Sequence, residues 1–170
     1  IAVLFIDLSK TKEINDHLVQ KDPANVVWQS DRAQLLVRLG ELLRERGDLP
    51  GALASHLAAR ELLGRLAQAD PSNTVWPYEL ALAHSRTAEV QREARDLPSA
   101  LASHRAALQV LRVLVKTVPD NVNLQRDLAM TLASLGVIGL RLDGGEPARQ
   151  HLLEGRDIIE RLVRQSPGDA

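Results

Sequence analysis

Proline recurs every 48 residues along this 170-residue chain, and the internal repeat that it marks constrains the fold more than any other feature. The recurring positions are Pro23, Pro71, Pro119 and Pro167, and Asn25, Asn73 and Asn121 keep the same step. Segments 22–69 and 70–117 share 22 identities in 48 positions, which is far above chance. A period of this length indicates that one supersecondary unit is repeated along the chain.

Each unit divides into two stretches with the periodicity of a helix. In residues 26–46, the apolar positions expected on one helix face are Val27, Leu35, Leu36, Leu39, Leu42 and Leu43. In residues 51–69, they are Ala52, Leu53, Ala59, Leu62, Leu63 and Leu66. Between the two stretches, Gly47 can end a helix in the left-handed conformation, Asp48 can cap the next helix and Pro50 fits a first turn. No stretch shows the sustained period of two that a strand requires.

The same turn recurs at residues 95–98 and, more loosely, at residues 143–147. Short turns make consecutive helices antiparallel, and a single helix pair cannot bury its own apolar face. Stacking the units buries that face, so the sequence predicts an all-α solenoid of antiparallel helix hairpins, with seven helices. Small residues that suit close helix approach recur at Ala52, Ala100, Ala148, Ala59, Ala107 and Gly155.

One domain, 1–170, is expected from this repeat. Residues 1–21 would be the lone second helix of a truncated unit, 22–69, 70–117 and 118–165 three full units, and 166–170 the start of the next linker. Both ends carry apolar side chains for which a stacked neighbour is missing: Leu4, Phe5, Leu8 and Leu18 at one end, and Ile158, Ile159, Leu162 and Val163 at the other. We therefore expect homo-association through the solenoid ends.

The units resemble the tetratricopeptide repeat family, which places large residues and Leu-Gly on its first helix and small, aromatic and small residues on its second. The residues that carry the resemblance are Leu36, Leu39, Gly40, Leu43, Ala52, His56 and Ala59 in the first unit, His84, Thr87, Ala88, Ala100, His104 and Ala107 in the second, and Leu132, Leu135, Gly136, Ala148, Leu152 and Gly155 in the third. The resemblance covers residues 22–165 and implies a right-handed superhelix. The units depart from the family in length, because they have 48 residues where the family's usual unit has about 34, so we interpret them as elongated repeats. An unrelated helical-hairpin repeat is the alternative interpretation.

Composition excludes several classes of function. The net charge of −1 lacks the basic footprint of a nucleic-acid-binding protein, and only four aromatic residues are present to stack on bases. Without cysteine the chain has no disulfide, no thiolate metal site and no cysteine nucleophile. The only long apolar run, residues 1–6, is too short to span a membrane, which takes roughly 20 residues. We expect no membrane contact and a cytoplasmic location, although the sequence leaves the compartment undecided.

No pattern of residues indicates catalysis. His56 and His104 fall in a packing column of the repeat, and no His-x-x-x-His pair supplies a helical metal site. Ser55 precedes His56 directly, and neighbours on a helix point about 100° apart, so the pair cannot act as nucleophile and base. The carboxylates alternate with arginines, as on a solvated helix face. We therefore expect no enzyme, no metal and no cofactor within these residues.

A charged triplet on the first helix of two units is the positive feature, since Glu41, Arg44 and Glu45 recur as Glu89, Arg92 and Glu93. The family resemblance implies that one face of each first helix lines a concave binding surface. Residue by residue, that surface is Gln34, Val37, Glu41, Arg44, Glu45, Leu82, Ser85, Glu89, Arg92, Glu93, Met130, Ala133, Val137, Leu140 and Arg141. The charges have two interpretations, a salt-bridged helix surface or a ligand-binding one.

Three functional hypotheses follow. The leading one is a non-enzymatic interaction scaffold that binds a peptide or a partner domain on its concave surface. The second is a structural spacer or self-association array within a larger multidomain protein. The third, an enzyme, would need a site shared with flanking sequence.

Overall fold

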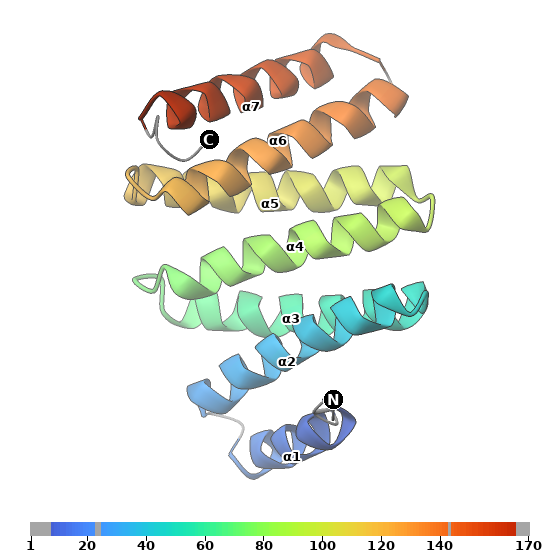
Figure 1. The fold of residues 1–170 in the computed structure, drawn as a ribbon. Coiled ribbons are helices and arrows are strands. Elements are labelled where there is room, and N and C mark those ends of the chain that lie inside the picture. The colour runs from blue at the N-terminus through green and yellow to red at the C-terminus, as the bar shows by residue number, and fades with distance from the viewer. Residues whose placement is uncertain (1–7, 23–24, 143, 166–170) are drawn as a thin grey trace, which may run out of the picture. The chain divides into compact units, whose positions relative to one another are not determined.

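The computed structural model describes residues 8–22, 25–142 and 144–165, and within these ranges every regular element is an α-helix (Figure 1). The helices are α1 (Leu8–Lys21), α2 (Val26–Glu45), α3 (Leu49–Ala69), α4 (Val75–Glu93), α5 (Leu97–Thr117), α6 (Val122–Leu142) and α7 (Glu146–Gln165). No strand occurs in the described ranges. The all-α class predicted from the 48-residue repeat is therefore confirmed.

The chain divides into two compact units, Ile1–Ala83 and His84–Ala170, with the boundary inside α4. Within the first unit, α1 packs on α2 and α2 packs on α3. Within the second unit, α5 packs on α6 and α6 packs on α7. In each unit, helices that follow one another in the sequence are neighbours in space.

The turn between α2 and α3 has the chemistry that its residues predict. Gly47 has a φ of 81°, in the left-handed region, and its N–H donates to the carbonyl of Arg44. The side chain of Asp48 accepts a hydrogen bond of 2.9 Å from the N–H of Gly51 and so caps α3. Proline follows in the first turn of the helix, where its missing N–H costs nothing.

The turn between α4 and α5 repeats this arrangement with one substitution. Asp96 caps α5 by accepting a hydrogen bond of 3.1 Å from the N–H of Ser99. Bonding to Ser99 also lowers the pKa of Asp96, because it favours the ionised carboxylate. Arg95 occupies the place of Gly47 and has a φ of 65°, where a side chain is strained. It is the one non-glycine residue with a positive φ among the described residues.

The asparagines that keep the 48-residue step are helix caps. The side-chain oxygen of Asn25 accepts from the N–H of Trp28 at 3.1 Å, and that of Asn121 accepts from Leu124 at the same distance. Asn73 accepts from the N–H groups of both Val75 and Trp76. The repeat thus conserves within the chain the residue type that satisfies the open donors at each helix start.

The core of the first unit lies between α2, α3 and the start of α4. Its fully buried members are Ala33, Leu36, Ala59, Leu62, Leu63 and Ala83. The apolar face predicted for α3 is buried except for Leu53, which is half-buried. The face predicted for α2 is partly wrong, because Val27 is 65% exposed and Leu42 is also exposed. Val27 precedes Leu36 by nine residues, and at about 100° per residue the two point to opposite sides of the helix.

Small residues allow close helix approach in the second unit, as the sequence predicts. Gly155 of α7 lies against α6, and a Cβ added there would meet the carbonyl oxygen of Ala129 at 3.0 Å. A Cβ on Gly136 would overlap the side chain of Leu152, and one on Gly139 would lie 2.9 Å from the Cβ of Ala148. Helices that approach this closely favour glycine at the crossing, because the Cβ of any other residue would crowd the neighbouring helix.

The apolar ends predicted from the sequence are only partly described. Leu4 and Phe5, and the side chains of Leu8 and Leu18, lie outside the described residues. On α7, Ile158 is buried, Leu162 is half-buried, and Ile159 and Val163 are exposed. None of the described helices combines the length and the apolar character needed to cross a membrane.

Candidate functional site

Five of the predicted surface residues lie on α2, in the first unit. Gln34 and Glu45 are exposed, whereas Val37, Glu41 and Arg44 are half-buried. Val37 packs against the core cluster of that unit, so its side chain contributes to folding. Leu82, on α4 in the same unit, is half-buried as well. The side chains on α2 therefore differ in how far they are available to a ligand.

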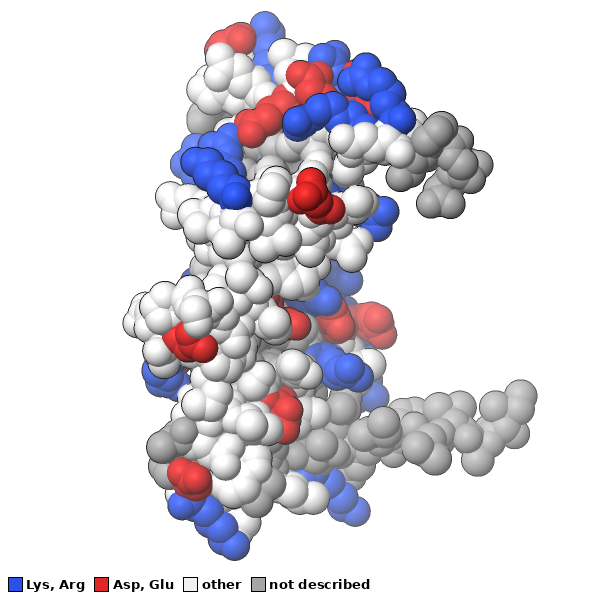
Figure 2. Space-filling view, turned by 90° about the vertical axis from the view of Figure 1, so that its left-hand side faces the viewer, with Lys and Arg blue, Asp and Glu red and all other residues white. Residues whose placement is uncertain are grey.

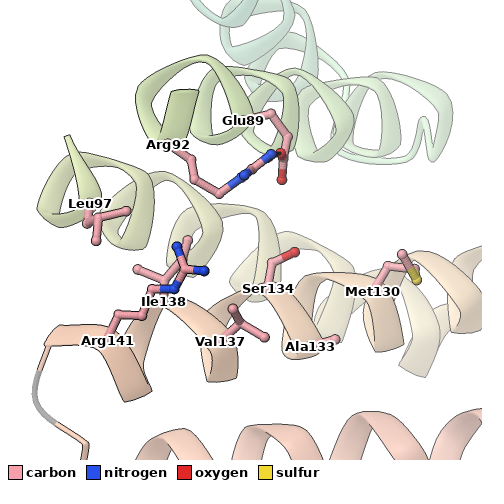
Figure 3. Close-up of a pocket in the computed structure, with 9 residues that line it drawn as sticks. All are labelled: Glu89, Arg92, Leu97, Met130, Ala133, Ser134, Val137, Ile138 and Arg141. Atoms are coloured by element: carbon pink, nitrogen blue, oxygen red, sulfur yellow. Dashed lines mark hydrogen bonds and ion pairs between the residues drawn. The ribbon is translucent and has the colours of Figure 1, made fainter. Parts of the chain in front are cut away.

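A hollow of about 290 Å³ lies in the second unit between α4 and α6, at the start of α5 (Figure 3). It is lined by Glu89, Arg92, Leu97, Met130, Ala133, Ser134, Val137, Ile138 and Arg141. Figure 3 shows Glu89 and Arg92 projecting from α4 toward α6, while Ser134 and Arg141 project from α6 toward α4. The hollow therefore combines charged side chains from two helices above a mainly apolar surface.

Glu89 is the most strongly stabilised charge at this hollow. Its Oε2 accepts from Nη2 of Arg92 at 2.6 Å and from Nε at 2.9 Å. Its Oε1 lies 3.5 Å from Nε2 of His104, a buried side chain on α5, at the outer limit of a hydrogen bond. The nearby His104 and Arg92 lower the pKa of Glu89 to about 2, so this carboxylate is ionised at neutral pH.

The α6 wall of the hollow presents apolar side chains to solvent. Met130 is 61% exposed and Val137 is 47% exposed, although both belong to a helix whose other face is buried. Arg141 is exposed at the end of the same stripe and makes no ion pair within the described residues. Exposed aliphatic side chains side by side on one helix are the usual mark of a contact surface.

The structure brings six of the predicted residues together in this hollow: Glu89, Arg92, Met130, Ala133, Val137 and Arg141. It leaves out Ser85, Glu93 and Leu140, which share the same helices, and Leu140 is exposed. The sequence did not predict Leu97, Ser134 or Ile138 at the hollow. Helical spacing could have predicted two of these residues, because Ser134 and Ile138 follow Met130 at steps of four residues and such positions are neighbours on a helix surface.

The serines that directly precede His56 and His104 have structural hydrogen-bond partners. The hydroxyl of Ser55 donates to the carbonyl of Gly51 at 2.9 Å, and that of Ser103 donates to the side chain of Gln91 at 2.8 Å. His151 lies on α7, where burial and the charge of Arg112 lower its pKa. No group of three or more histidine, aspartate or glutamate side chains that could hold a metal occurs in the part of the chain that the structure describes.

Charges of both signs lie on the face of the molecule drawn in Figure 2. In the face drawn in Figure 2, lysines and arginines lie beside aspartates and glutamates, most densely over α7 at the top. Contacts of this kind include Arg112 with Glu154 at 2.6 Å and Arg156 with Asp157 at 2.8 Å. Exposed pairs contribute little to folding. Over α7, the described residues of this face therefore present both signs of charge side by side.

Comparisons with known proteins assign no family. No protein-family model matches the chain, and a search of curated proteins finds no match either.

Proposed function

We propose that the protein is a non-enzymatic interaction scaffold that binds a peptide or a partner domain on the first-helix surface of its repeat. The proposal includes a right-handed solenoid of seven helices similar to tetratricopeptide repeats, folded as one domain. The 48-residue sequence repeat and the packing of consecutive helices support it. A scaffold of this kind offers an extended surface rather than a deep pocket.

The exposed apolar stripe on α6 carries the functional part of the proposal. Met130 and Val137 stay in contact with solvent beside the charged wall that Glu89 and Arg92 form. Keeping apolar surface in water costs about 25 cal/mol of free energy for each Å², relative to burying it. A partner that covers the stripe would regain that free energy, which gives the surface a physical reason to bind.

The size of the hollow favours side chains over a cofactor. At about 290 Å³ it lies at the lower limit of small-molecule sites, which measure roughly 300 to 1,000 Å³. Such sites also bury most of their ligand, whereas Met130 and Val137 leave this one open to solvent. A few side chains of a partner segment fit these dimensions better than a nucleotide-sized molecule.

A selection with a matched control tests the proposal. A displayed library of 12-residue peptides is panned against the protein and counter-selected against Val137→Asn, which makes the stripe more polar. The control is Val113→Asn, because Val113 is 64% exposed on α5 and does not line the hollow. Peptides that bind the protein and the control variant but not Val137→Asn support the scaffold.

The competing hypothesis is a structural spacer or self-association array. It predicts that the selection yields no peptide sensitive to Val137→Asn. The exposed Ile159 and Val163 on α7 favour self-association as its mechanism. Sedimentation at increasing concentration would then show oligomers that Val163→Asp dissociates, and a monomer at all concentrations would argue against it.

A further inference from the structure

The charges that line the hollow do not cancel. Glu89 carries one negative charge, and Arg92 and Arg141 carry one positive charge each. Arg92 donates two hydrogen bonds to Glu89, so these two neutralise each other at close range. Arg141 makes no ion pair or hydrogen bond within the described residues, and its guanidinium has five donors. Among the described residues, the charge of the hollow that has no partner is therefore the cation on α6.

The repeat shows that this cation is a local departure. Arg141 stands in the column that holds Glu45 in the first unit and Glu93 in the second. In the same helix, Val137 occupies the column of Glu89, and an acidic residue is thus replaced twice. The α6 wall has become apolar and cationic where the equivalent helices of the chain carry carboxylates.

We propose that the hollow receives a segment of a partner protein in which a carboxylate side chain is flanked by aliphatic residues. The carboxylate would pair with Arg141, and the aliphatic side chains would cover Val137 and Met130. This inference rests on the proposed scaffold function and names the chemistry of its partner. An Arg–carboxylate pair has two parallel hydrogen bonds, so it fixes the position of the segment as well as adding affinity.

The other residues that line the hollow are also compatible with a carboxylate from the partner. The hydroxyl of Ser134, which points toward α4, has no hydrogen-bond partner within the described residues and can donate to an incoming oxygen. Glu89 would repel a carboxylate placed beside it, but Arg92 neutralises the charge of Glu89 at close range. A lysine in the partner would lie beside the like charge of Arg141 and would find no free acceptor for its own hydrogen bonds. The apolar lining likewise disfavours a nucleic-acid backbone, whose phosphates need several cations.

Three peptides of ten residues, acetylated and amidated to remove terminal charges, test the partner chemistry. They share a Leu-Leu-X-Leu-Leu centre and differ only at X, which is Asp, Asn or Lys. Binding is measured by isothermal titration calorimetry at low and at high salt. We expect the Asp peptide to bind about tenfold more tightly than the Asn peptide, as one charge-assisted hydrogen-bonded pair would give, and the Lys peptide to bind more weakly still.

Variants assign the preference to one side chain. Arg141→Glu introduces the residue that the column has in the other two units, so the fold should tolerate it. We expect this variant to prefer the Lys peptide over the Asp peptide. Arg126→Glu, an exposed position on α6 outside the hollow, changes the net charge equally and should leave the preference unchanged.

The outcomes separate this inference from the scaffold function. If the three peptides bind equally and Val137→Asn abolishes all binding, the hollow binds peptides but the acidic partner is wrong. A preference for Asp that persists in Arg141→Glu also overturns the inference. If none of the three binds, the inference fails, and the library selection decides separately on the scaffold. Circular dichroism of each variant confirms that the helices are intact.

Discussion

The imidazole of His56 in α3 lies directly against the backbone of Gly40 in α2. A Cβ added to Gly40 would come within 2.5 Å of Cε1 and 2.8 Å of Nε2 of that ring. His56 is fully buried and cannot move aside without disturbing the core. This repeat column holds histidine in two units, His56 and His104, and the glycine opposite His56 makes room for its ring.

Gly40→Ala should therefore destabilise the first unit, although alanine favours helices. We expect a loss of about 2 kcal/mol in the free energy of unfolding, as for other overpacked core positions. Urea unfolding measured by tryptophan fluorescence reports this change, because Trp28 and Trp76 both belong to the first unit. Adding His56→Ala should recover part of the loss, since the two positions are in contact.

Gly64→Ala provides the matched control. Gly64 lies inside α3, and a Cβ there would meet no atom within 4 Å. The substitution should stabilise the unit by about 0.5–1 kcal/mol, the intrinsic helix preference of alanine over glycine. Equal effects of the two glycine substitutions would contradict the close packing of His56.

The packing columns could be predicted because the repeat presents them several times. A position that holds Ala52 and Ala100 in two units, with Ala148 in the third, must be small for a structural reason, and the structure buries all three. The face of α2 was harder to predict, because that helix has apolar residues on several sides. Leucine content alone does not distinguish Leu36, which is buried, from Leu42, which is exposed.

Arg95→Gly should stabilise the second unit. Arg95 has a φ of 65°, and a left-handed residue with a side chain costs roughly 1–2 kcal/mol relative to its usual conformation. Glycine removes this cost, but it also raises the conformational entropy of the unfolded chain. We therefore expect the free energy of unfolding to rise by about 1 kcal/mol. Thermal and urea unfolding measured by circular dichroism would show it as a higher midpoint.

Gly47→Ala is the reciprocal substitution at the equivalent turn of the first unit. Its φ of 81° is unfavourable for alanine, and no side chain lies close enough to compensate. We expect a loss of about 1 kcal/mol. If Arg95→Gly and Gly47→Ala shifted stability in the same direction, backbone strain would not be the cause.

Stability should depend on Glu89 at acidic pH. The folded state lowers its pKa from 4.5 to about 2, so between these values the unfolded chain binds more protons than the folded one. The contribution of Glu89 is therefore complete above about pH 4.5 and is lost as the pH falls toward 2. We expect Glu89→Gln to unfold at a lower urea concentration than the parent at pH 6, and the difference to shrink by pH 2.5.

Glu93→Gln is the control for that titration, because it removes one carboxylate from the same helix but does not line the hollow. It should change stability little at either pH. His104→Leu removes the buried partner of Glu89 and should weaken the acid dependence in the same direction as Glu89→Gln. An unchanged pH profile in His104→Leu would rule out the contact between Glu89 and His104 as the source of the acid dependence.

The hollow itself was only partly predictable. The resemblance to tetratricopeptide repeats predicted Glu89, Arg92 and Val137 on one surface, and all three line the hollow. It missed Leu97, the first residue of α5, which reaches the hollow only through the fold. It also assigned His104 to packing, where its contact with Glu89 gives it an electrostatic role as well. Repeat columns predict which residues are equivalent, but not which neighbours each one meets.

The proposed solenoid predicts that Glu41 of α2 and Glu89 of α4 lie in one row. They occupy equivalent columns of successive units, and the proposed solenoid would pack the first helices of successive units side by side, with axes roughly 8–10 Å apart. Because the chain has no cysteine, Glu41→Cys with Glu89→Cys places the only two thiols. A bismaleimide of matching length should join them within one molecule in high yield. Pairing Glu41→Cys with Gln109→Cys, which the solenoid places on the opposite surface, should give none, and equal yields from the two pairs would refute the shared row.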